Sequence, residues 1–148
     1  MAGPFPAPEV VLKSCFHLAY HVTDLDASRR FYGDLLGCAE GRSTDTWVDF
    51  DFFGHQISLH LGEPFTVTAT GKVGEHMVQM PHLGVILPAE DWKALAAKLE
   101  AAGIDFVIKP FLRFPGQPGE QYTMFFLDPS GNPIEVKGFT DFDRIFAS

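Results

Sequence analysis

Cysteines and basic residues are scarce in this sequence, and both scarcities limit what the protein can do. The only cysteines are Cys15 and Cys38, too few for a disulfide framework. Cys15 falls in an expected strand, where a buried free thiol is ordinary. Lysine and arginine total 11 against 19 acidic residues, giving a net charge of -8 without any basic cluster. We therefore expect a reducing compartment and no binding to nucleic acid or anionic membranes.

Long hydrophobic runs are missing as well. No segment approaches the length of a membrane span, and the proline-bearing residues 1–8 contain no lysine or arginine. The expectation is a cytoplasmic protein without a signal peptide. Hydrophobic residues make up 46% of the chain and charged residues 20%, a globular balance, so we expect one domain over residues 1–148 with a single core.

Two segments of the chain follow the same pattern. Each begins with a histidine in an apolar strand (16–22 and 81–87), continues into an amphipathic helix (26–36 and 91–102) and later reaches a glycine turn. Superposing the segments places His17 on His82 and Gly54 on Gly131. Strands are expected at 47–52, 56–61, 105–108 and 121–127, with a proline-rich loop over 110–120. An internal duplication with a linker between the halves follows.

This duplication, the FYGDLLG stretch at 31–37 and the DPSGNPIE ending at 128–135 together resemble the vicinal oxygen chelate superfamily over about residues 14–138. That family includes glyoxalase I, extradiol dioxygenases, epimerases, fosfomycin-resistance enzymes and metal-free bleomycin-binding proteins. The resemblance implies an α+β fold of two βαβββ modules, about 14–62 and 81–140 with a linker at about 63–80. Their curled mixed sheets would enclose one metal-binding cavity, and a homodimer is implied by analogy. Whether the modules pair within one chain or between two stays open.

The resemblance also implies a set of metal ligands: His17, His82 and Glu135. Two neutral imidazoles and one carboxylate leave open coordination positions, which suits non-haem Fe(II) and its oxygen chemistry. Nickel, zinc or manganese are the other candidate metals. A buried Glu135 must be paired or ligated if the cavity is dry.

Ser58 distinguishes between the activities of the family. The repeat places Ser58 on Glu135, where glyoxalase I relatives carry an acidic ligand that also moves the substrate proton. Three ligands therefore favour a dioxygenase. His60 lies two residues further along the strand and on the same face, so we expect it to act as an acid or base beside the metal; a small shift in register would instead make it a fourth ligand.

Five residues are expected to contact the substrate. They are Gln56, Ser58, Arg113, Tyr122 and Phe125. Extradiol relatives place a tyrosine ten residues before the carboxylate ligand, and this chain has Phe125 there. Part of the catechol-cleaving machinery is thus missing, although the primary iron site is kept.

Three functional hypotheses follow from these residues. The first is a non-haem Fe(II) extradiol-type dioxygenase that uses O2 and binds a small substrate through two neighbouring oxygen atoms. The second is a glyoxalase I-like lyase or isomerase using nickel or zinc. The third is a metal-free drug-binding resistance protein, against which the retention of His17, His82 and Glu135 argues.

Overall fold

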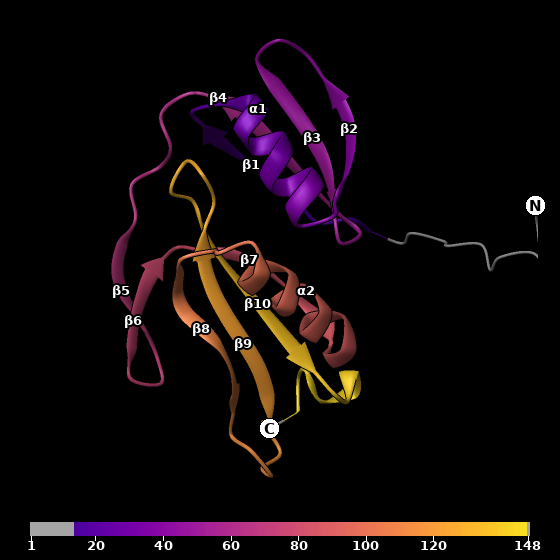
Figure 1. Ribbon diagram of the computed structural model, residues 1–148, viewed down its shortest axis with the longest axis vertical. Helices are drawn as coiled ribbons and strands as arrows, with labels where there is room; N and C mark the ends of the chain where they lie inside the picture. Colours follow the sequence, from indigo (N-terminus) through magenta and orange to yellow (C-terminus); the bar gives the residue numbers. More distant parts are fainter. Residues whose placement is uncertain (1–13, 148) are drawn as a thin grey trace, which may run out of the picture.

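The computed structural model describes residues 14–147, and Figure 1 shows two similar modules, one above the other, with a β-hairpin at one side. The first module contains β1 (His17–Val22), α1 (Leu25–Ser28) continued by the π-helical η1 (Arg29–Leu35), β2 (Ala39–Ser43), β3 (Trp47–Phe52) and β4 (His55–Leu61). The second contains β7 (Leu83–Pro88), α2 (Ala89–Ala101), β8 (Phe106–Arg113), β9 (Gln121–Leu127) and β10 (Pro133–Phe139). The hairpin is β5 (Thr68–Val73) with β6 (His76–Met80), and a short 3₁₀ turn η2 (Phe142–Arg144) follows β10.

The two sheets have the same topology. Their strand orders are β1-β4-β3-β2 and β7-β10-β9-β8, and in each the first strand runs parallel to the last. Ala19 pairs with Ser58 in the first sheet as Gly84 pairs with Glu135 in the second. The registers therefore confirm the superposition of Ser58 on Glu135, and the α+β fold of two βαβββ modules is confirmed with it.

The first helix forms where the sequence supplies its cap and its apolar face. The Asp24 carboxylate accepts a hydrogen bond from the Ala27 amide, which stabilises the first turn. Phe31 and Tyr32 are buried against the sheet, and Gly37, with φ of 77°, ends the helix in the left-handed region that glycine adopts most easily. Within residues 14–147, no helix is both long enough and apolar enough to cross a membrane.

A shared apolar core joins the modules. It combines buried residues of the first sheet and helix with residues of α2, β9 and β10, and the rings of Phe31 and Phe126 lie 6.1 Å apart across the junction. A polar network lies within this core. The Tyr20 hydroxyl donates to Tyr32, and the Tyr32 hydroxyl donates to Asp128 over 2.8 Å each. Burial raises the pKa of both tyrosines well above the usual value, so both hydroxyls stay protonated donors.

The Tyr32→Phe substitution tests this network. It removes the donor to Asp128 and the acceptor of Tyr20 in a fully buried setting. We expect the free energy of unfolding to fall by about 1–3 kcal/mol in urea denaturation. Tyr122→Phe, at a half-buried tyrosine beside Lys93, is the matched control and should change stability by less than about 0.5 kcal/mol. Equal stabilities of Tyr32→Phe and the wild type would show that the network contributes nothing.

Three local features differ from the expectations. The segment expected as a linker contains the β5–β6 hairpin, whose Val73 and Val78 pack with Ile108 and Phe125 of the second sheet. β8 extends through Pro110 to Arg113 because it is an edge strand, where a missing amide donor is tolerated. Cys15 precedes β1 and is exposed, whereas Cys38 is the buried thiol; burial raises the pKa of Cys38 to about 11.

Candidate metal centre

His82 and Glu135 form the centre of the candidate site. The Nε2 atom of His82, just before β7, lies 3.3 Å from Oε1 of Glu135 on β10. Both side chains are largely buried, with exposed fractions of 17% and 7%. The strands approach so closely that a Cβ on Gly84 would overlap the backbone carbonyl of Glu135. A glycine at position 84 is therefore needed for β10 to present its carboxylate beside His82.

Hydrogen bonds fix the orientation of both groups. The Gln79 carbonyl lies 2.7 Å from Nδ1 of His82, and a carbonyl can only accept, so Nδ1 carries the proton. When the imidazole is neutral, the lone pair of Nε2 therefore points at the carboxylate. The second carboxylate oxygen, Oε2, accepts a hydrogen bond from the Thr123 hydroxyl over 2.7 Å. The edge of the Phe125 ring packs against His82, with centroids 4.9 Å apart.

This pair of atoms fits a metal ion. Two acceptor atoms 3.3 Å apart repel each other unless a proton or a cation lies between them. Ligands about 2.1 Å from one ion are separated by about 3.0 Å in an octahedron and about 3.4 Å in a tetrahedron, so the observed distance matches neighbouring ligands of one ion. Metal ligands usually form hydrogen bonds through the atoms that do not bind the metal, as Nδ1 of His82 does with Gln79 and Oε2 of Glu135 does with Thr123.

The imidazole of His17, on the first module, is oriented by a hydrogen bond at Nδ1 as that of His82 is. It belongs to the polar face of the first sheet (His17, Asp49, Gln56, Ser58 and His60), which alternates with the core-facing residues of the same strands. Nδ1 of His17 lies 2.7 Å from Oε1 of Gln56. Nε2 of Gln56 donates to Asp49, which leaves Oε1 as the acceptor and places the proton of His17 on Nδ1. Its Nε2 lone pair is therefore free to ligate.

The expected convergence of all three ligands does not occur within one chain. Among residues 14–147 no three histidine, cysteine or acidic side chains come together as a metal site. His82 and Glu135 meet, but His17 is exposed on the first sheet. The reason is that His17 does not line the cavity onto which His82 and Glu135 open.

A cavity of about 1050 Å³ lies between the modules. His82, Glu135 and Lys137 line it from the second module, and His21 and His60 from the first. The remaining wall is mostly apolar and includes Phe16, Leu18, Phe52, Ile57, Phe65, Leu83, Val85 and Ile86. Its size and composition suit a small organic molecule. His60 packs against Trp47, with ring centroids 6.2 Å apart, while Nδ1 of His21 contacts the Glu63 carbonyl.

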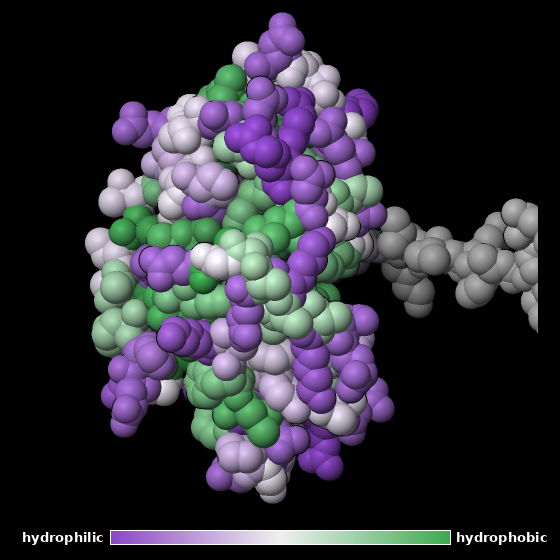
Figure 2. Space-filling model, viewed as in Figure 1, coloured by the Kyte–Doolittle hydropathy of each residue, from purple (hydrophilic) through white to green (hydrophobic). Residues whose placement is uncertain are grey.

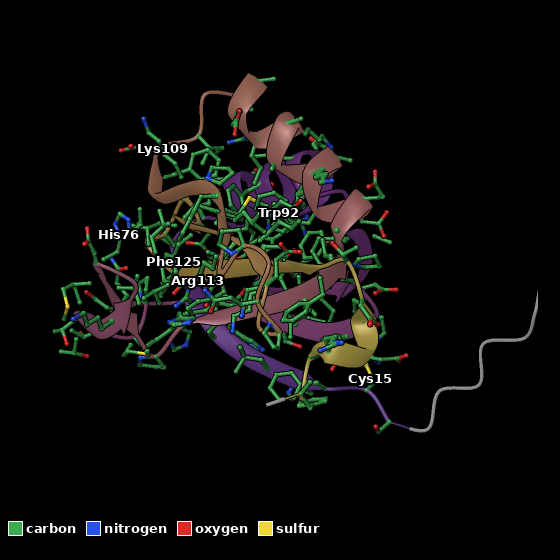
Figure 3. The ribbon with its side chains drawn as sticks, turned by 90° about the horizontal axis from the view of Figure 1, so that it is seen from below. Cys15, His76, Trp92, Lys109, Arg113 and Phe125 are labelled. Carbon is green, nitrogen blue, oxygen red and sulfur yellow. The ribbon has the colours of Figure 1, made fainter. Side chains whose placement is uncertain are left out.

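The structure separates the other predicted contact residues. Tyr122 lies on the helix side of β9, where its ring packs on that of Trp92 with centroids 4.9 Å apart, and it does not line the cavity; its contact with the substrate stays a prediction. The Arg113 guanidinium stacks over Phe114 at 4.8 Å at the end of β8 and does not line the cavity. Phe125 is fully buried between the hairpin and the second sheet (Figure 3) and touches His82 rather than open space.

Sequence reasoning missed three groups that support the site. Thr123 and the Gln79 carbonyl hold Glu135 and His82, and Asp49 lies behind Gln56 and Ser58. Asp49 is not distinctive in the sequence, because the same strand contains Asp51 and alternates acidic with apolar residues; the structure shows that Asp49 is only 8% exposed. The backbone carbonyl of Gln79 has no sequence signal at all.

The topology and the two histidines with fixed Nδ1 protons define a class of protein: two βαβββ modules whose sheets carry a candidate metal site. Within that class, a family model described as the Glyoxalase/Bleomycin resistance protein/Dioxygenase superfamily matches residues 15–136. The chain belongs to this superfamily. Its members commonly depend on divalent metals, bind small molecules and form dimers.

Solved structures agree with this assignment. A glyoxalase/bleomycin resistance protein/dioxygenase from Alicyclobacillus acidocaldarius is 30% identical, with a TM-score of 0.72 over 90% of this chain and 97% of that one. A fosfomycin resistance protein from Listeria monocytogenes has 16% identity and a TM-score of 0.64 over 90% and 98%. A virulence protein from Salmonella typhimurium has 23% identity and a TM-score of 0.58 over 88% and 99%. The last two show the fold alone.

Proposed function

We propose that this chain is a cytoplasmic, homodimeric Fe(II) dioxygenase that acts on a small substrate with two neighbouring oxygen atoms. His17, His82 and Glu135 would hold the metal, and O2 would be the second substrate. The observation that carries the proposal is the pair of histidines whose Nδ1 protons are both fixed by acceptors, one of them 3.3 Å from a buried carboxylate. Two imidazoles and a carboxylate with open positions are typical of non-haem Fe(II) oxygenases.

We infer further that the third ligand comes from a second copy of the chain. His17 is exposed and its Nε2 is free, whereas His82 and Glu135 lack a third partner within residues 14–147. A two-fold dimer that places the polar face of one first module over the second module of the other copy completes two identical sites. The apolar side chains that such contacts would cover include Phe16, which is 64% exposed, together with Phe65, Met77, Met80 and Phe111. Figure 2 shows apolar surface as a band at the level where the modules meet.

The metal site, His60, Ser58 and the apolar wall of the cavity would then have different roles in the reaction. The bound metal would act as a Lewis acid that lowers the proton affinity of the two substrate oxygens. His60 lines the cavity and has no hydrogen-bond partner within residues 14–147, so its imidazole is available to move a substrate proton. The Ser58 hydroxyl donates to Asp49 and keeps its lone pairs for a substrate donor. The apolar wall excludes water from the reacting atoms.

Metal content and oxygen uptake test the proposal. Protein purified without oxygen should retain about one iron per chain, and a panel of catechols and enols should contain compounds that cause oxygen consumption. Nickel or zinc without oxygen uptake would replace the dioxygenase by a glyoxalase I-like lyase or isomerase. A failure to retain any metal under loading would leave a drug-binding protein.

The His60→Gln substitution tests the role in proton transfer. We expect the rate of substrate-dependent oxygen uptake to fall by about 100-fold, because general acid-base catalysis is lost, while metal content stays unchanged. His76→Gln, at an exposed histidine of β6, is the matched control and should leave the rate unaltered. Loss of the metal in His60→Gln would instead assign His60 as a fourth ligand.

A further inference from the structure

The two modules carry similar hydroxyl–carboxylate pairs with the partners exchanged between strands. In the second module the carboxylate is Glu135 on the last strand, and Thr123 on the neighbouring strand donates to it. In the first module the hydroxyl is Ser58 on the last strand, and the carboxylate is Asp49 on the neighbouring strand, 2.6 Å away. The first module therefore has an acidic side chain, Asp49, on β3, whereas the repeat would place one at position 58 on β4.

Asp49 lies at the end of a hydrogen-bonded chain that leads to His17. Its Oδ2 atom accepts from Nε2 of Gln56 over 3.4 Å, and Oε1 of Gln56 contacts Nδ1 of His17 over 2.7 Å. An ionised carboxylate can only accept, so Gln56 must turn its amino group towards Asp49 and its oxygen towards His17. That oxygen in turn requires the proton of His17 on Nδ1.

Asp49 is a buried acid without a basic partner. It is 8% exposed, and no lysine, arginine or histidine among residues 14–147 forms an ion pair with it. Burial of such a charge is unfavourable unless hydrogen bonds or a cation compensate for it. The carboxylate receives two hydrogen bonds, and the amide of Gln56 connects it to the imidazole that would hold the cation.

We propose that Asp49 is a positioning residue that, through Gln56, holds His17 in the tautomer whose Nε2 can bind the metal. This inference rests on the proposed function for its purpose, but the tautomer itself is a property of the metal-free chain. Asp49→Asn keeps the shape of the side chain and removes the constraint, because an amide can present either an oxygen or an amino group to Gln56. Gln56 can then turn over and donate to Nδ1 of His17, which moves the proton to Nε2.

Imidazole ¹⁵N chemical shifts of the metal-free protein, recorded where the histidines are neutral, report the tautomer directly. In the wild type we expect the Nδ1–H form of His17. In Asp49→Asn we expect a mixture or the Nε2–H form, and an affinity for Co(II) that is lower by about 10- to 100-fold. Asp45→Asn removes the same charge from an exposed loop position and should match the wild type in both measurements. His82 is an internal control, because its Nδ1 proton is held by Gln79 in every variant.

Two results would overturn the role of Asp49. One is an Nε2–H form of His17 in the wild type, a measurement that needs no variant to fold. The other is an unchanged tautomer in both Asp49→Asn and Gln56→Leu. A third result separates the two proposals. If His17 has the Nδ1–H form in the wild type and loses it in Asp49→Asn, but the wild type binds no Co(II), the positioning role of Asp49 is confirmed and the proposed metal enzyme is wrong.

Discussion

The Glu135→Gln variant should lose its metal. Glutamine keeps the length of the side chain, and its amide oxygen can still accept from the Thr123 hydroxyl, so the fold of β10 should persist. The neutral amide is a far weaker ligand than a carboxylate and leaves the lone pair of His82 without a charged neighbour. We expect the affinity for Fe(II) or Co(II) to fall by more than about 100-fold.

Thermal unfolding provides a second measure of the same loss. A metal present at about 100 times its Kd stabilises the wild type by about 2.7 kcal/mol, and this stabilisation should disappear in Glu135→Gln. Glu100→Gln, at an exposed position near the end of α2, is the control and should retain both the metal and the stabilisation. Wild-type affinity in Glu135→Gln would remove Glu135 from the ligand set.

Mixing two inactive variants should restore metal binding. His17→Ala leaves the second module intact, and Glu135→Ala leaves the first module intact. If each site combines the first module of one copy with the second module of the other, a dimer of the two variants contains one complete site and one doubly defective site. The purified mixed dimer, selected by two affinity tags, should bind about half the metal of the wild type, whereas each variant alone binds none.

The same experiment distinguishes the two ways in which the modules can pair. Sites built within one chain would give no metal binding in the mixed dimer, because every chain lacks one ligand. A mixed dimer of His82→Ala with Glu135→Ala is the matched control. Both substitutions then lie in second modules, so no complete site forms and no metal should bind.

The duplicated topology of this chain is predictable from its sequence because the signals are local and repeated. Asp24 and Gly37 mark the ends of the first helix, and Gly54 and Gly131 set equivalent hairpins, which fixes the register that places Ser58 on Glu135. The β5–β6 hairpin was not predictable in this way. Only Val73 and Val78 of the hairpin are buried in the core, and they are buried by packing against Ile108 and Phe125, a contact that has no local signal in the sequence.

The candidate site was predictable in its residue types but not in its assembly. The histidines and Glu135 stand at repeat-related positions, yet how the modules pack depends on the core contact of Phe31 with Phe126 and on the link from Tyr32 to Asp128. Neither contact has a local signature. Asp49 was overlooked because an alternating strand with acidic residues is typical of a solvated face, while the strand pairing buries it beside Ser58.

The position of a bound metal tests the central claim most directly. Crystals of Co(II)- or Fe(II)-loaded protein should show one anomalous peak per chain about 2.0–2.2 Å from Nε2 of His82, a carboxylate oxygen of Glu135 and Nε2 of His17 from a second copy. A peak held by other residues, or none at saturating metal, would contradict the account.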